Sequence, residues 1–297
     1  MRKFQFISSF VLKIAALLFM TLDHVGLVLQ MSYPYIDWVR MLASIFRTAG
    51  RLALPLFVFM IVEGVLHTKN IKKYFLRLGI MAGIITIVLI LLTYVNFGID
   101  VGGLANEGNI FLDLILVALC IYLLNQENKW LRLLTLLPLG ISFASFFAKC
   151  FEFANPNFDV LWYPNWLYLQ YDWFSLLLGI GFYLSYKMME IYKRFAKENN
   201  GIDAHIWEIE GNYRLGVAMI QVSFLIAVSF LFYSFHYIWP SGVFWDYKTQ
   251  LWAILSGALI LLYNGARGYN AKWFQYGAYI YYPLHLVIIA MIYVLIS

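Results

Sequence analysis

Ionisable side chains inside otherwise apolar runs are the residues of this 297-residue sequence best suited to chemistry. Asp23 and His24 are adjacent in one apolar run, and Glu63 and His67 lie four residues apart in another. In a helix, four residues make about one turn, so Glu63 and His67 are predicted to share a face. Asp23 and His24 point about 100° apart and therefore cannot both face one partner. Ionisable groups at membrane depth are rare and mark functional sites, so all four are candidate site residues.

His24 is predicted to be a general base, because imidazole titrates near neutral pH and a nearby carboxylate, Asp23 or Glu63, raises its basicity. The structural alternative is that Asp23 and His24 only pin their helix to a neighbour. His285 follows Pro283 in the last apolar run. This proline withdraws one N–H from the helix, so a kink that turns His285 inward is predicted. A purely structural interhelical hydrogen bond stays open for His285.

Arg51 follows Gly50 at the start of the Glu63 run. Its guanidinium fork is suited to clamping an anion or a carbonyl oxygen, and the alternative is an arginine that snorkels to lipid headgroups. Glu63 and His67 are suited to relaying protons or to pairing structurally. A metal site is not predicted, because the sequence has no His-Glu-x-x-His pattern and no further ligands at metal-binding spacing.

A set of cations at the ends of apolar runs is the second candidate site. Its members are Lys69, Lys72, Lys73, Arg77 and Arg267, the last within the segment Asn264–Gly268. Such a set is suited to docking a phosphate-bearing cosubstrate from the cytoplasm. The structural alternatives are an ordinary positive cytoplasmic loop and, for the segment Asn264–Gly268, a helix C-cap followed by a turn.

The elements that must position these residues are predicted from composition. The chain is 63% hydrophobic and only 12% charged, against roughly 45–50% and about 25% in soluble domains. We therefore expect an all-α, polytopic helical bundle in the plasma membrane, with residues 1–297 forming one domain in the lipid bilayer. The net charge of +5 does not predict a nucleic-acid partner, because the cations lie between apolar runs. Cys120 and Cys150 are not expected to form a disulfide.

Nine spans are predicted, with an amphipathic interface helix near 36–48 as a tenth, partly inserted element. The spans are 10–31, 51–67, 73–95, 109–125, 130–149, 171–193, 214–236, 249–264 and 273–296. Lys and Arg are concentrated at alternate ends, beginning with Arg2 and Lys3, so the N-terminus is predicted to be cytoplasmic and the C-terminus outside.

Seven segments, taken together, resemble the TraX family and follow its order between about residues 13 and 290. They are Asp23-His24, Gly50–Phe57 with Glu63-Gly64 and His67-Thr68, Lys73–Leu78, Gly108–Phe111, Tyr171–Leu177, Tyr263–Gly268 and Tyr281–Leu286. The resemblance implies an integral membrane acetyltransferase, similar to pilin N-acetylases, that uses acetyl-CoA. The acceptor it implies is an amine or hydroxyl of a pilin-like peptide, a glycan or a lipid.

The resulting hypothesis places acetyl-CoA phosphates at the cytoplasmic cations, His24 as the base, and Arg51 or His285 at the oxyanion. Asp23 and His24 are expected at the level of Arg51, so the pantetheine arm must thread much of the membrane. Two alternatives remain: a proton-coupled transporter that uses the ionisable residues as a relay, and a non-catalytic membrane assembly factor. The lack of an inverted repeat weakens the transporter interpretation.

Overall fold

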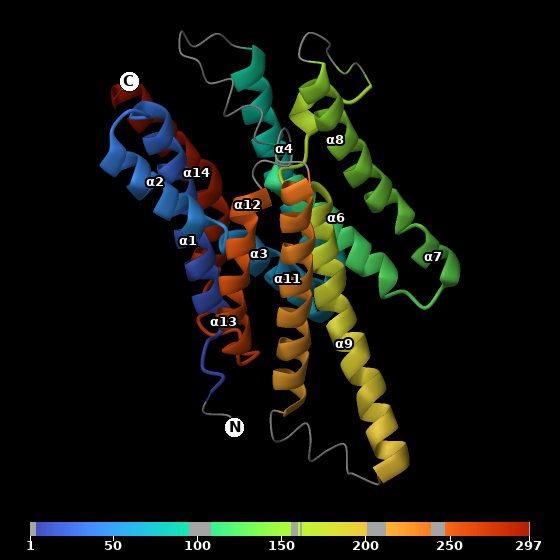
Figure 1. Cartoon of the computed structure of the whole chain (residues 1–297). Coiled ribbons are helices and arrows are strands. Elements are labelled where there is room, and N and C mark those ends of the chain that lie inside the picture. Colours follow the sequence, from blue (N-terminus) through green and yellow to red (C-terminus); the bar gives the residue numbers. More distant parts are fainter. Residues whose placement is uncertain are drawn as a thin grey trace.

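Apolar stretches of this length fold as helices in lipid, because only a helix bonds every backbone N–H and C=O within its own segment. The computed structural model describes residues 4–94, 108–155, 160, 162–200, 212–238 and 247–296. Within these residues the chain is an all-α bundle, as predicted (Figure 1). Its long helices that are apolar enough to cross a membrane are Ser9–Ser32, Asp37–His67, Ile71–Leu91, Lys129–Ala154 and Tyr213–Ile238. They indicate a multi-pass membrane protein.

The number of spans and the orientation stay predictions. Five described helices meet the length and composition of a span, and Ile110–Leu124 and Lys248–Leu261 are shorter apolar helices. Arg2, Lys3 and residue 95, the last residue of the predicted span 73–95, lie outside the described residues. We call the end of the bundle at which the first helix begins the N-side; it is the lower end in Figure 1.

The first three helices form a hairpin whose second arm consists of two helices joined by a turn (Figure 1). Helix α1 (Ser9–Ser32) leaves the N-side, α2 (Asp37–Gly50) returns beside it, and α3 (Ala53–His67) continues to the N-side. Arg51 and Leu52 form a turn between α2 and α3. Pro55 is the third residue of α3, where the backbone N–H has no intrahelical partner, so the helix tolerates it.

The prediction of an interface helix near 36–48 is corrected by α2, which packs along α1. Val39 and Ala43 on its apolar face are buried, and the backbone oxygen of Ala43 lies against Gly26 of α1. An amphipathic pattern looks the same whether its apolar face meets lipid or another helix. Here Gly26 permits close approach, so the Val39 and Ala43 side of α2 meets α1, while Trp38 and Ile45 stay exposed.

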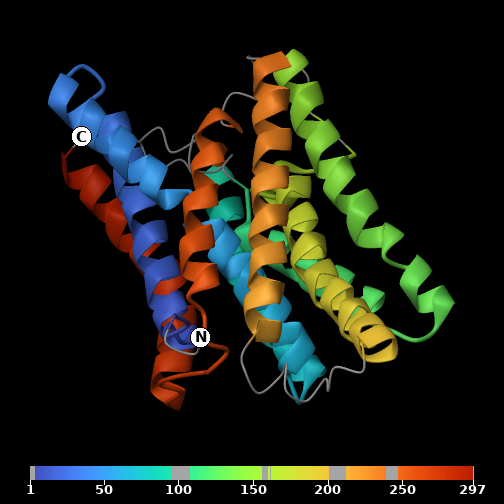
Figure 2. The ribbon, with the colours of Figure 1, turned by 60° about the horizontal axis from the view of Figure 1, so that its bottom comes forward.

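Helix α3 lies inside the bundle, where its residues Leu54, Leu56, Val58 and Val62 are almost fully buried. The remaining helices complete the bundle. They are α4 (Ile71–Tyr94), α6 (Ile110–Leu124), α7 (Lys129–Leu133), α8 (Leu136–Ala154), α9 (Asp172–Asn200), α11 (Asn212–Ile238), α12 (Tyr247–Gln250), α13 (Ser256–Leu261) and α14 (Lys272–Ile296). Both ribbon views place α14 beside α1, on the side away from α8 (Figures 1 and 2).

The loop between α13 and α14 is tied to the chain's first described segment. The N–H of Ile7 donates to Leu262 O at 2.9 Å, and the N–H of Asn264 returns a bond to Ile7 O at 2.9 Å. The N–H of Ser9 adds a third bond to Ala266 O. The loop that carries Arg267 is therefore held in place at the N-side, next to the start of α1.

Candidate functional site

A cavity of about 600 Å³ lies at the N-side of the bundle. Its walls come from α1, α3, α4, α6, α11, α14 and the loop after α13. The ionisable and phenolic residues that line it are Lys13, Glu63, His67, Tyr74, Arg77, Arg214, Tyr263, Arg267, Tyr269, Tyr279 and Tyr282. Helices that begin or end at the N-side thus bring side chains from distant parts of the sequence around one space.

Glu63 and His67 form one wall of this cavity, and they share a helix face as the spacing predicts. The Nδ1 of His67 lies 3.0 Å from the backbone oxygen of Glu63 and 3.8 Å from its Oε2. A carbonyl oxygen only accepts, so Nδ1 carries the proton and Nε2 is left to accept. The hydroxyl groups of Tyr186 and Tyr263 both donate to the Glu63 carboxylate. The wall therefore presents a carboxylate held by two phenols and an imidazole beside it.

Lys13 and Arg214 are cavity cations that the sequence reasoning did not assign to a site. The Lys13 ammonium lies 5.8 Å from the centre of the Phe274 ring, and the Arg214 guanidinium lies 5.4 Å from that of Tyr263. Gly265 has a φ of 76°, and a Cβ there would collide with the Arg214 guanidinium. Lys13 had a usable signal, a lysine within an apolar run, whereas Arg214 follows ordinary loop charges and had none.

The predicted docking residues separate into two groups. Arg77 and Arg267 line the cavity and are exposed at its mouth. Lys69, Lys72 and Lys73 are exposed and are not part of its lining. The Asn264 side chain accepts from the N–H of Ala266 at 2.8 Å, so it shapes its own loop.

His24 and His285 meet between α1 and α14, although 261 residues separate them in the sequence. The Nε2 of His285 lies 3.4 Å from the Nδ1 of His24, and His285 is only 4% exposed. The His24 Nδ1 lies 2.8 Å from Met20 O, and the His285 Nδ1 lies 3.0 Å from Tyr281 O. Both Nδ1 atoms therefore carry protons, His285 Nε2 accepts from His24, and His24 Nε2 keeps its lone pair. The inward position predicted for His285 is confirmed.

Asp23 does not orient His24, in contrast to the expected arrangement. Its carboxylate instead forms a 2.9 Å ion pair with Arg47 of α2. Glu63 is engaged by Tyr186 and Tyr263, as described above. The sequence shows that Asp23 and His24 need different partners, and the partners are Arg47 and His285. Helix periodicity predicts such a separation but does not identify the neighbours.

Arg51 lies level with Asp23, as expected, because a Cβ on the preceding Gly50 would collide with the Asp23 side chain. Arg51 is 7% exposed. This burial contradicts the alternative in which Arg51 snorkels to lipid headgroups, since a snorkelling head group stays in contact with water.

The histidine pair lies just beyond the inner end of the cavity. Leu17 and Tyr282 line that end, and the Tyr282 ring lies edge-on to His285 with 5.4 Å between ring centres. Lys13 and His24 are eleven residues apart on α1, which corresponds to about 16 Å of helix rise. The cavity therefore covers part of the path that the pantetheine arm is predicted to follow.

A Thr21–Tyr281 contact lies in the region between cavity and histidine pair. The Tyr281 hydroxyl lies 2.6 Å from Thr21 Oγ1, and Thr21 itself donates to Leu17 O at 2.8 Å. The Tyr281 ring stacks on His285 with 5.3 Å between ring centres. The contact therefore fixes His285 from the cavity side.

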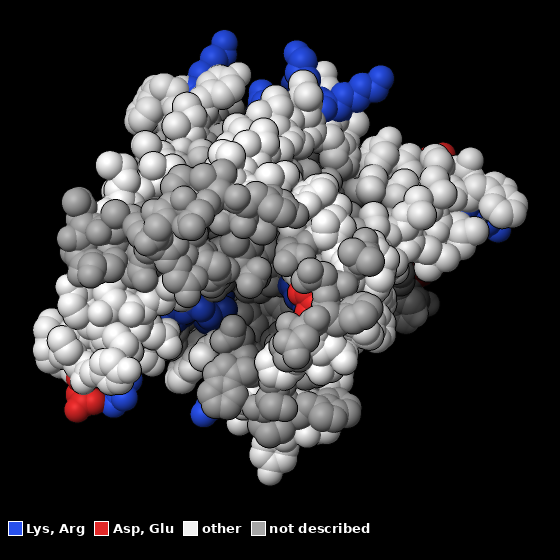
Figure 3. Space-filling view, turned by 90° about the horizontal axis from the view of Figure 1, so that it is seen from above, with Lys and Arg blue, Asp and Glu red and all other residues white. Residues whose placement is uncertain are grey.

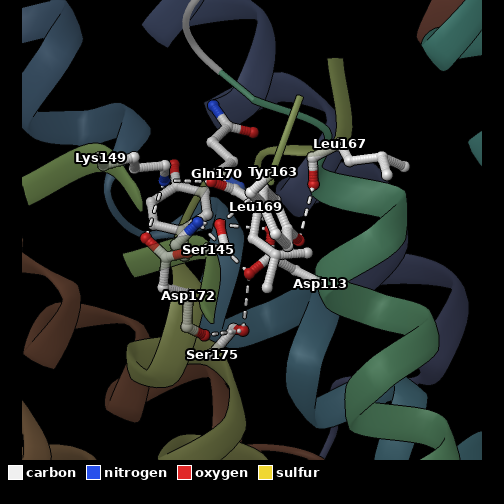
Figure 4. A network of polar contacts seen from close by, with 10 residues as sticks. Asp113, Ser145, Lys149, Tyr163, Leu167, Leu169, Gln170, Asp172 and Ser175 are labelled. Carbon is white, nitrogen blue, oxygen red and sulfur yellow. Dashed lines mark hydrogen bonds and ion pairs between the residues drawn. The ribbon is translucent and has the colours of Figure 1, made fainter. Parts of the chain in front are cut away.

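A second polar cluster, which sequence analysis missed, is centred on Asp113 of α6 (Figure 4). The fully buried Asp113 carboxylate accepts from the N–H of Gln170 at 2.7 Å, from the N–H of Tyr171 at 3.3 Å and from Ser175 Oγ at 2.9 Å. We call this cluster, with the residues of the next paragraph, the Asp113 network. Its signal in the sequence is a single acid within the apolar run Ile110–Leu124.

The other half of the Asp113 network joins α8 to the start of α9. Lys149 pairs with Asp172 at 2.7 Å and also donates to Leu169 O. Ser145 Oγ accepts from the N–H of Leu169 at 3.0 Å. Burial raises the pKa of Tyr163, in the loop before α9, to about 12, so its phenol stays protonated and donates to Leu167 O. The network fastens the 163–172 segment to α6 and α8.

Among the described residues, no group of three or more His, Cys, Asp or Glu side chains is placed to hold a metal ion. Cys120 and Cys150 are free thiols.

Comparison with known proteins adds the following findings. The family model described as TraX protein matches residues 8–199. A stretch of 73 residues is 40% identical to the probable fimbrial assembly protein FimC, serogroup H1, of Dichelobacter nodosus. This alignment covers 24% of the present chain and 27% of that protein, so the chain spans about a quarter of its relative. No solved structure matches the chain significantly.

Proposed function

Because this chain belongs to the TraX family, we propose that it is a membrane acetyltransferase. It moves an acetyl group from cytoplasmic acetyl-CoA to an amine or hydroxyl of a membrane-associated or extracytoplasmic acceptor. One observation carries the proposal: a basic cavity at the N-side ends next to the His24–His285 pair. A cosubstrate that is charged at one end and reactive at the other fits such an arrangement.

The N-side is the proposed cytoplasmic side, and acetyl-CoA enters the cavity there. Arg77 and Arg267 at the mouth meet its phosphates, since arginine binds phosphate oxygens through paired hydrogen bonds. The pantetheine arm lies along Glu63 and the phenols, and the thioester reaches the end lined by Leu17 and Tyr282.

His24 acts as the general base in this proposal. Its Nε2 takes the proton from the acceptor amine or hydroxyl, whose N or O atom attacks the thioester carbonyl carbon. The new C–N or C–O bond forms, the C–S bond breaks, and the CoA thiolate takes the proton back from His24. Charged His24 is stabilised because its Nδ1–H points at His285 Nε2 and Met20 O. Arg51 is the proposed oxyanion donor, and the Asp23–Arg47 pair holds α2, after whose last residue Arg51 follows, against α1.

Glu63 and His67 take a second role nearer the mouth. His67 Nε2 and the Glu63 carboxylate face the cavity, so they are proposed to pass protons between the reacting end and the cytoplasm. The same residues would form the relay of a proton-coupled transporter.

The acceptor is proposed to approach from the side opposite to the cavity mouth. Seen from that side, the molecule is hollowed at its centre, and both basic and acidic atoms are visible inside the hollow (Figure 3). A pilin-like peptide is one acceptor class, because a relative of part of the chain carries the name of a fimbrial assembly protein. A glycan or lipid acceptor has the same nucleophilic groups.

A non-catalytic role in fimbrial assembly is the second candidate, and the name of that same relative favours it. An assembly factor does not need a basic cavity that leads to a histidine pair, so acetyl transfer distinguishes the two.

The test uses membranes that contain the full chain and acetyl-CoA labelled in its acetyl group. We expect label in protein, glycan or lipid with the wild type, and loss of that label with His24→Gln. His236→Gln, on α11 and outside both sites, is the matched control and keeps the wild-type signal. The absence of both a labelled product and a thermal shift with millimolar CoA would contradict the proposed enzyme.

A further inference from the structure

The cavity cations differ from other cations of the described bundle in what they contact. Arg47 pairs with Asp23, Lys149 with Asp172 and Lys187 with Glu190. Within the described part of the chain, no ion pair joins Lys13, Arg77, Arg214 or Arg267 to a carboxylate. Lys13 and Arg214 lie over Phe274 and Tyr263, and Arg77 lies 5.9 Å from the centre of the Tyr276 ring.

An aromatic ring holds a cation in position without neutralising it. Three of the four cavity cations are therefore oriented by a ring and not by an ion pair. Among the described residues, four cations and the carboxylate of Glu63 line the cavity, so positive charge is in excess by three. Like charges around a confined space of low dielectric repel one another, and a multiply charged anion removes that repulsion.

Arg214 is the most firmly placed of the four. The Tyr263 ring lies on one side of its guanidinium, and the backbone of Gly265 lies so close that no Cβ fits between them. Its planar fork is preorganised in this way, so little side-chain entropy is lost when it forms two parallel hydrogen bonds to phosphate oxygens. Lys13 lies deeper, in the second turn of α1, whereas Arg77 and Arg267 are exposed at the mouth.

We propose that Arg214 is the central residue of a pyrophosphate-binding site, with Lys13 behind it and Arg77 and Arg267 at the mouth. The ligand class is an organic diphosphate ester, because its charge matches the threefold excess better than a phosphate diester with one charge, such as a lipid headgroup. The proposal rests on the proposed function where it identifies this diphosphate as that of acetyl-CoA. It assigns the phosphates to the cavity and not to Lys69, Lys72 and Lys73 outside it.

The test measures binding to the full chain in detergent, by thermal shift and by calorimetry. The probes are acetyl-CoA, ADP, pantetheine and short-chain phosphatidylglycerol. We expect acetyl-CoA and ADP to bind and to compete, and pantetheine and the lipid to bind at least tenfold more weakly than ADP. Stronger binding of phosphatidylglycerol than of ADP would make the site a lipid site and overturn the proposal.

Arg214→Met is expected to weaken ADP and acetyl-CoA binding at least tenfold. The matched control is Lys187→Met: Lys187 also lies over an aromatic ring, Tyr183 at 5.7 Å, but has Glu190 as its partner. This control keeps wild-type affinity. If Arg214→Met does not fold, Arg214→Lys retains the charge without the fork and is expected to weaken ADP binding several-fold. Unchanged ADP affinity in the folded variant overturns the proposal.

These experiments distinguish failure of the diphosphate site from failure of the proposed acetyltransferase activity. Acetyl transfer with an unchanged KM for acetyl-CoA in Arg214→Met refutes the site and leaves the proposed function standing. ADP binding that depends on Arg214, without any transfer of acetyl groups by the wild type, supports the diphosphate site and refutes the acetyltransferase.

Discussion

The N-side cavity and the Asp113 network both place charged groups among apolar helices, but they use them differently. In the network each carboxylate faces donors of the same chain: Asp113 meets two backbone N–H groups and Ser175, and Asp172 meets Lys149. In the cavity, three of the four cations lie over aromatic rings, and all four line a shared space. The network is closed in the sense that its charged groups are paired by its own residues, whereas the cavity leaves its charges for a ligand.

Charged groups that stabilise a membrane bundle and charged groups that bind a ligand can be distinguished by their partners. A buried polar group costs free energy unless it is paired, so a charge that serves the fold is satisfied within the fold. A charge that serves a ligand keeps part of its hydrogen-bonding capacity. By this criterion the Asp113 network holds helices together, and the cavity and the His24–His285 pair are where binding and chemistry are expected.

The largest effect is expected where the closed network is opened. Asp113→Ala leaves two backbone N–H groups and the Ser175 hydroxyl without their acceptor, and we expect a loss of roughly 3–5 kcal/mol in the free energy of unfolding. Denaturant unfolding in detergent measures it, with Asp113→Asn, which keeps one carbonyl acceptor, as the milder control. A loss below about 1 kcal/mol would show that the network is not structural.

The Asp23–Arg47 pair tests whether a second closed contact behaves in the same way. Arg47→Met strands the buried Asp23 carboxylate and is expected to cost roughly 3 kcal/mol. Asp23→Asn combined with Arg47→Met is expected to recover most of that loss, because no buried charge then stands alone. Additive losses in the double variant would contradict the pairing as the source of the effect.

The histidine pair is expected to respond in rate instead of stability. His285→Leu removes the acceptor facing His24 Nδ1, so we predict a fall in kcat of about 10- to 100-fold with KM for acetyl-CoA nearly unchanged. His285 is a positioning residue, and a melting temperature near that of the wild type checks the fold. An equal rise in KM would place His285 in the cosubstrate site instead.

The smallest effects make the comparison quantitative. Tyr186→Phe removes one donor to Glu63, and Ser175→Ala removes one donor to Asp113. We expect about 0.5–1.5 kcal/mol for Tyr186→Phe, since water in the cavity can replace the phenol, and about 1.5–3 kcal/mol for Ser175→Ala. Equal losses in unfolding experiments would remove the proposed distinction between an open and a closed site.

Local features could be predicted from the sequence because they depend on helix periodicity and composition. The all-α bundle, the shared face of Glu63 and His67, and the different partners needed by Asp23 and His24 all follow from spacing. The partners themselves do not, because His24 and His285 meet across 261 residues of sequence. The packing of α2 against α1 could not be predicted either, since an amphipathic pattern is compatible with contact to lipid or to another helix.

The lining of the cavity could also be predicted only in part from the sequence. Arg77 and Arg267 were predicted as docking residues from their positions at helix ends, and the structure places both in its lining. Lys13 and Arg214 join them only through the packing of α1 and α11 against the loop after α13. An isolated lysine in an apolar helix, like Asp113 in its own helix, marks a candidate site in the sequence. It does not show whether the residue belongs to a structural network or to a ligand-binding cavity.

The most direct test of the account is acetyl transfer by His24→Gln compared with the wild type and with His236→Gln. Labelled acetyl-CoA, membranes containing the full chain and a melting-temperature check are sufficient. The account predicts a loss of about 10²–10⁴-fold in transfer for His24→Gln, with acetyl-CoA binding and His236→Gln unchanged. Full transfer by folded His24→Gln would contradict it, because the cavity would then lead to a histidine pair that takes no part in the reaction.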